Sequence, residues 1–128
     1  MNKPILIAAL VSAATFGLHV VGGGAEFHQP IQASSMALPL RAISAILWHA
    51  VSMLLVLQAA ALMWLAHHPN PALSLFIAVV QIGFAALFLF YGVTMIGSVW
   101  VLGQWVIFVA IAALVLWGIR PTAQAGMR

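Results

Sequence analysis

Charged side chains are scarce in this sequence, and their scarcity excludes most classes of soluble protein. The 128 residues include a single acidic residue, Glu26, and four lysines and arginines. Charged residues therefore make up 4% of the chain, whereas a soluble domain carries about 25%. Because 66% of the residues are hydrophobic, we expect a lipid bilayer rather than water to surround most of the protein. Four scattered cations are also too few for binding nucleic acid.

Cysteine is absent, which excludes a disulfide, a thiolate metal site and a thiol nucleophile. A serine hydrolase is poorly supported as well. Ser44 or Ser52 would need His49 beside it and an acid behind the imidazole, and Glu26 is the only acid in the chain. We therefore predict no catalytic residue and expect a binding or structural protein rather than an enzyme.

Four apolar stretches are long enough to cross a bilayer, which requires about 20 residues each. They cover, approximately, residues 4–22, 40–66, 72–96 and 99–119. Segment 23–39 is rich in glycine and proline, and "HHPNP" contains two prolines, which cannot continue a helix. Gly97 marks a weaker break, so the last two spans would form a tight hairpin. The sequence predicts an all-α fold, namely an integral membrane four-helix bundle that forms a single transmembrane domain over 1–128, with an outer loop at 23–39.

The few cations predict the orientation of this bundle. Lys3 precedes the first span, and Arg120 and Arg128 follow the fourth, so the positive-inside rule places both ends in the cytoplasm (N-in/C-in). The loop at 23–39 then faces outward, which for a bacterial inner (plasma) membrane means the periplasm. Arg41 lies on the outer side and needs another explanation. A cleaved signal peptide is the alternative interpretation of the first span.

Polar side chains follow one side of each of the first two spans, in their outer halves. On a helical wheel of 100° per residue, Ser12, Thr15 and His19 fall within about 60°. A second stripe, within about 140°, comprises Arg41, Ser44, Trp48, His49 and Ser52. Lipid cannot hydrogen-bond such groups, so we expect the two stripes to face each other. With the outer loop folded over them, the candidate ligand-binding residues of an outward-facing pocket are His19, Glu26, His28, Arg41, His49 and Ser52.

The chemistry of this predicted pocket leaves several ligands open. Imidazole and carboxylate groups suit a transition metal, for which His19, Glu26 and His49 are the candidate ligands. Histidines on separate helices are also typical of haem binding in a bundle. Arg41 instead favours a small anionic ligand, because a cation opposes the binding of a second cation. The protein would then be a binding protein or an accessory subunit, as a homo-oligomer or within a larger membrane complex.

Two other interpretations use the same residues. In the first, the polar cluster only fixes helix packing: Glu26 forms a salt bridge with Arg41, and the histidines hydrogen-bond each other, Ser44 or Ser52. In the second, the protein is a homo-oligomeric small-molecule transporter, similar in size and plan to the small multidrug exporters. Those exporters carry a carboxylate within the first span, whereas Glu26 is predicted to lie beyond it. Separately, Gln81 inside the third span is expected to make one interhelical hydrogen bond.

Two stretches of the sequence resemble a known group of proteins. "LHVVGGGAEFHQP" and "RAISAILWHAVSMLL" are similar to segments of small, uncharacterised four-span proteins of bacterial inner membranes. The resemblance covers the first two spans, which are less than half of the chain. It implies a similar topology and a shared site at His19, Glu26, Arg41 and His49, and it implies no activity.

Overall fold

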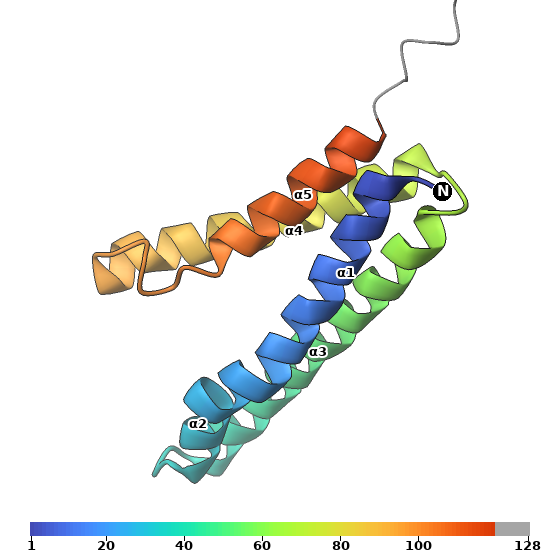
Figure 1. Cartoon of the computed structure of the whole chain (residues 1–128). Coiled ribbons are helices and arrows are strands. Elements are labelled where there is room, and N and C mark those ends of the chain that lie inside the picture. Colours follow the sequence, from blue (N-terminus) through green and yellow to red (C-terminus); the bar gives the residue numbers. More distant parts are fainter. Residues whose placement is uncertain (120–128) are drawn as a thin grey trace, which may run out of the picture.

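The computed structural model describes residues 1–119, and its regular structure is helical. This part of the chain contains no strand, which confirms the predicted all-α class. Arg120 and Arg128, on which the predicted orientation depends, lie outside the described residues. The elements are α1 Lys3–Leu18, η1 His19–His28, α2 Gln29–Ala33, α3 Leu38–Leu65, α4 Pro71–Tyr91, η2 Gly92–Ile96 and α5 Trp105–Gly118, where η denotes a π-helix (Figure 1).

Within residues 1–119, three helices are long and apolar enough to cross a membrane. They are Lys3–Ala33, which combines α1, η1 and α2, then Leu38–Leu65, and Pro71–Ile96, which combines α4 and η2. Such a set is typical of a multi-pass membrane protein. The apolar helix α5 has 14 residues. At 1.5 Å per residue it is about 21 Å long, shorter than a hydrocarbon core of about 30 Å.

The outer loop predicted over residues 23–39 is wrong, because most of this segment is helical. The first helix continues through η1 and α2 to Ala33, and only residues 34–37 separate it from α3. The three consecutive glycines lie in η1, and π-helical turns within longer helices are frequent at functional sites. Pro30 lies in the first turn of α2, where proline is tolerated. Glu26 therefore belongs to the first apolar helix and not to a loop.

The predicted break at Gly97 is present between η2 and α5. Gly97 has a φ of +74°, a left-handed conformation that glycine adopts at little cost. Turns occupy most of the segment that follows, so α5 begins at Trp105 rather than near Val99. The helices α4 and α5 then lie side by side, as the predicted hairpin requires (Figure 1).

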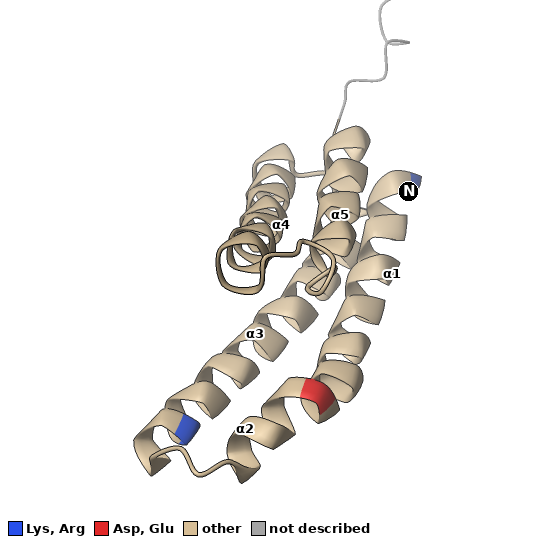
Figure 2. Cartoon of the chain, turned by 90° about the vertical axis from the view of Figure 1, so that its left-hand side faces the viewer, with Lys and Arg blue, Asp and Glu red and all other residues tan. Residues whose placement is uncertain are grey.

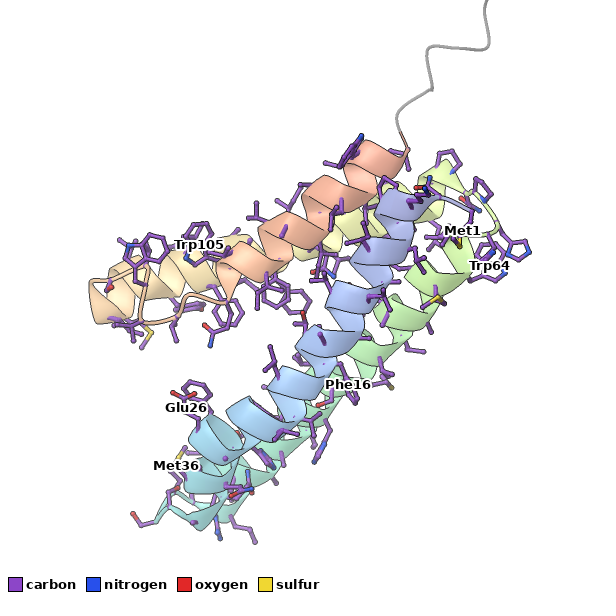
Figure 3. All side chains as sticks on the ribbon, in the orientation of Figure 1. Met1, Phe16, Glu26, Met36, Trp64 and Trp105 are labelled. Carbon is purple, nitrogen blue, oxygen red and sulfur yellow. The ribbon has the colours of Figure 1, made fainter. Side chains whose placement is uncertain are left out.

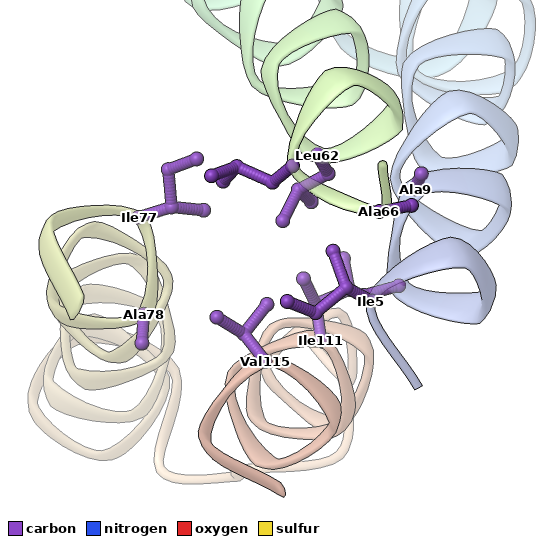
Figure 4. Close-up of a cluster of buried hydrophobic side chains, with 10 residues drawn as sticks. Ile5, Ala9, Leu62, Ala66, Ile77, Ala78, Ile111 and Val115 are labelled. Atoms are coloured by element: carbon purple, nitrogen blue, oxygen red, sulfur yellow. The ribbon is translucent and has the colours of Figure 1, made fainter. Parts of the chain in front are cut away.

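The helices form two arms that meet at one end, which we call the vertex (Figure 1). In one arm α1, η1 and α2 lie along α3, and in the other arm α4 lies along α5. At the vertex, a core of buried side chains joins both arms, and alanines in it allow the helices to approach closely (Figure 4). This core consists of Ile5, Ala8, Ala9, Leu62, Leu65, Ala66, Ile77, Ala78, Ile111 and Val115.

Polar contacts also join the elements near the vertex. The Asn2 side chain donates to the backbone oxygen of Gly118 at 2.7 Å, and the Asn2 backbone N–H donates to the backbone oxygen of Ala66 at 2.7 Å. Farther along the arms, Gln81 Nε2 in α4 donates to Gln58 Oε1 in α3. This contact confirms the predicted interhelical hydrogen bond of Gln81. Both glutamine side chains are buried.

Candidate functional site

A cleft of about 870 Å³ lies between the two arms. Side chains of α1, η1 and α3 form one wall, and side chains of α4, α5 and the turn before α5 form the other. Most of the lining is apolar. The side chains with hydrogen-bonding groups that line it are Thr15, His19, Glu26, Ser44, Trp48 and Gln104. Of the six ligand-binding residues predicted from the sequence, the cleft therefore contains only His19 and Glu26.

Glu26 is an exposed residue of η1, and its side chain points toward the α4–α5 arm (Figure 3). The neighbouring Gly23 holds η1 close to α3: a Cβ atom at this position would come within 3.0 Å of the Trp48 ring. An alanine here would require the Trp48 ring or the backbone of η1 to shift by a few tenths of an ångström. Within residues 1–119, no cation forms an ion pair with Glu26, since Lys3 is at the vertex and Arg41 bonds elsewhere (Figure 2).

His19 joins the end of α1 to α3. Its Nε2 lies 3.1 Å from Ser52 Oγ, and its ring stacks on Trp48 with ring centroids 3.9 Å apart and an interplanar angle of 18°. Ser52 Oγ in turn donates to the backbone oxygen of Trp48 at 3.0 Å. The two polar stripes predicted from the helical wheels do meet at this point. The hydrogen bond between a histidine and Ser52, expected if the cluster fixes helix packing, is present.

His28 and His49 continue a row of rings that leads away from the cleft. The His28 ring lies 5.3 Å from the Trp48 ring and 5.5 Å from the His49 ring, measured between centroids. His49 is exposed, and neither histidine lines the cleft. His19 and His49 are thus separated by Trp48 and His28 instead of sharing a pocket.

Arg41 joins α3 to α2 at the end of this arm that lies farthest from the vertex. Its Nη1 donates to the backbone oxygen of Gln32 at 2.8 Å, and Gln32 Nε2 donates to the backbone oxygen of Arg41 at 3.0 Å. The pair links α2 to the first turns of α3 across the short connection at 34–37. The predicted salt bridge between Glu26 and Arg41 is therefore wrong. The hydrogen bonds with Gln32 explain why Arg41 lies on the predicted outer side.

The structure does not assemble the predicted metal site. Among the described residues, no three histidine, cysteine, aspartate or glutamate side chains are placed to hold a metal ion. The predicted set of His19, Glu26 and His49 is split, because Glu26 lines the cleft and His49 lies beyond His28. The His19 ring is already engaged with Ser52 and Trp48, so the geometry gives no support to a haem axial ligand either.

The far wall of the cleft was missed by reasoning from the sequence. It includes Phe84, Leu87, Phe88, Ile107 and Phe108. Phe108 stacks with Phe84 and with Phe88 of α4, at centroid distances of 5.1 and 5.6 Å. The spacing of Phe84, Leu87 and Phe88, at positions i, i+3 and i+4, is a local signal of a shared face. It does not distinguish a cleft from lipid, because both are apolar.

Comparison with known proteins identifies no family or ligand for this site. The resemblance of the first two spans to four-span inner-membrane proteins stays a prediction. The chain matches no protein-family model, no curated protein and no solved structure.

Proposed function

We propose that the chain is a four-span protein of the bacterial inner membrane, with both ends in the cytoplasm and the cleft opening outward. Lys3 lies at the vertex, and the positive-inside rule favours the cytoplasmic side for this end (Figure 2). The fourth span would be residues 99–119, which include α5 and the turns before it, and α5 packs against both α4 and α1. The ends of the arms farthest from the vertex then reach the outer boundary of the membrane.

The function proposed for this protein is to bind an elongated hydrophobic molecule with one polar end. The observation that carries the proposal is the cleft of about 870 Å³, with apolar walls and a few polar groups. Pockets for small molecules typically measure about 300–1,000 Å³ and combine apolar walls with a few polar groups that orient the ligand. An alkyl tail matches the polarity of such walls, which leaves the few polar groups to orient the other end of the molecule.

A small anion is a poorer ligand than the sequence suggested. The Arg41 guanidinium bonds to Gln32 and does not line the cleft, whereas the Glu26 carboxylate does. Two like charges 4 Å apart repel each other by about 1 kcal/mol in water and by more where water is displaced. An anionic group entering the cleft would meet this repulsion without a compensating cation from residues 1–119.

Photolabelling of the full chain in maltoside micelles tests whether the cleft binds such a molecule. The probe is a neutral monoacylglycerol that carries a diazirine near the end of its alkyl tail. We expect adducts on cleft peptides from both walls, and we expect excess unlabelled monoacylglycerol to suppress them. Labelling that is spread evenly over all apolar helix surfaces would refute the proposal, since the probe would then only replace surrounding detergent.

The helix α3 offers a matched pair of control variants. Leu47 is 60% exposed and lines the cleft, whereas Leu57 is 57% exposed and does not. Leu47→Trp should fill part of the cleft and reduce labelling of both walls, and Leu57→Trp should leave it unchanged. Because the chain has no cysteine, Leu47→Cys is also a clean reporter. Efficient disulfide-linked dimers formed without any specific labelling would assign the cleft to a second copy of the chain and overturn the proposal.

A second role, in helix packing, is supported by a separate observation. The contacts of His19 with Ser52 and of Arg41 with Gln32 both join the first helix to α3. They hold the wall of the cleft that carries Glu26. This role is compatible with ligand binding, and stability measurements on Arg41 variants test it independently.

A further inference from the structure

We propose that the ligand of the cleft is a membrane-resident amphiphile with a cationic head group, an amine or a quaternary ammonium, which the Glu26 carboxylate holds. This inference rests on the proposed function and adds the charge of the ligand to it. Its tail would lie along α3 and point toward the vertex. Three features of the structure support this assignment: the charge of the cleft, the position of Glu26 along the helix, and the direction of the apolar stripe.

Among residues 1–119, Glu26 is the one acidic, lysine or arginine side chain that lines the cleft. Glu26 is the only acid in the sequence, and its carboxylate lines a cleft to which no lysine or arginine of residues 1–119 contributes. The two cations in this part of the chain are Lys3, at the vertex, and Arg41, which is bonded to Gln32 (Figure 2). An acid left without an ion-pair partner beside an apolar cleft is complementary to a cation that arrives with an apolar body.

The position of Glu26 suits a head group. The 16 residues of α1 from Lys3 to Leu18 span about 24 Å at 1.5 Å per residue, and Glu26 lies about two turns beyond Leu18. Its distance from the vertex is therefore roughly the thickness of the hydrocarbon core, about 30 Å. With the vertex on the cytoplasmic side, the carboxylate lies near the outer boundary of the membrane, where the head group of an amphiphile would lie.

The apolar stripe on α3 suits the tail. Its lining residues recur every third or fourth position from Leu40 to Leu55 and so follow one face of the helix. These 15 steps extend over about 22 Å. Leu55 is 1% exposed and packs with Ala85 and Phe108, so the two arms meet there and close the inner end. A tail that enters beside Glu26 thus has an apolar track that ends before the vertex.

The test compares three photoprobes with the same alkyl tail and diazirine: a trimethylammonium, a neutral glycerol ester and a sulfonate. In maltoside micelles at low ionic strength, we expect the ammonium probe to label cleft peptides about two- to fivefold more than the neutral probe, as one ion pair with an exposed carboxylate predicts. The sulfonate probe should label them least. Tetramethylammonium, which has the head group without a tail, should not compete at the same concentration, because the ligand is membrane-resident.

Variants of Glu26 separate this inference from the proposed function. Glu26→Gln should abolish the preference for ammonium while labelling by the neutral probe persists, and Glu26→Lys should make the sulfonate the preferred probe. Lys3→Gln, a charge change at the vertex, should leave the preference unchanged. A wild-type protein without a preference, or a preference that survives both Glu26 variants in folded protein, would overturn the inference. Loss of specific labelling by the neutral probe would overturn the proposed function as well.

Discussion

Replacing Gln81 with leucine tests how the two arms are held together. Gln81 and Gln58 are 0% and 5% exposed, and the hydrogen bond between them joins α4 to α3. Gln81→Leu removes the donor and leaves the whole amide of Gln58 unpaired in apolar surroundings. Interhelical hydrogen bonds in membranes contribute about 0.6–1.7 kcal/mol, and an unsatisfied buried group costs about 1–3 kcal/mol. We therefore expect a loss of about 1–2 kcal/mol in the free energy of unfolding.

The double variant Gln58→Leu/Gln81→Leu provides the decisive comparison. Gln58 Nε2 and Gln81 Oε1 already lack hydrogen-bond partners, so the double variant removes two unsatisfied groups together with the bond. It should be at least as stable as the unmodified protein, because replacing both polar partners by apolar groups of similar shape is nearly neutral. Unfolding by sodium dodecyl sulfate in mixed micelles, followed by circular dichroism, measures both variants. Additive losses in the double variant would refute the proposed coupling of the two glutamines.

Two further predictions concern the vertex and the wall that carries Glu26. Gly118→Ala would bring a Cβ atom within 2.5 Å of the buried Ile5 side chain, so we expect a loss of about 1–3 kcal/mol in the free energy of unfolding, measured by the same assay. The control is Gly17→Ala, whose Cβ atom meets no atom within 4 Å and which should be neutral or stabilising. Arg41→Gln removes the guanidinium bond to Gln32, and thermal unfolding should show a loss of about 1–2 kcal/mol that Arg41→Lys partly restores. An Arg41→Gln variant as stable as the unmodified protein would contradict the packing role of this link.

The candidate site was predictable only in part. The helical wheels correctly predicted that His19 faces the polar stripe of α3 that contains Trp48 and Ser52. The prediction succeeded because the periodicity of a helix is local and polar groups in lipid must find partners. The same reasoning failed for Glu26. Three glycines and a proline nearby suggested a loop, but a π-helical segment continues the first helix and turns the carboxylate toward the other arm. The partner of Arg41 was also unpredictable, since it depends on how α2 packs against α3.

The sequence by itself determined the class of the protein. A chain with 66% hydrophobic and 4% charged residues is suited to lipid, and lipid requires backbone hydrogen bonds to be satisfied within each helix, so long apolar stretches predict helices. Only the tertiary structure decided that the two arms diverge and leave a cleft. Residues that face the cleft and residues that face lipid are equally apolar, so composition cannot distinguish them. Whether a residue faces the cleft or lipid depends on non-local contacts that hold one end of the arms together. The contacts of Asn2 with Ala66 and Gly118 are examples.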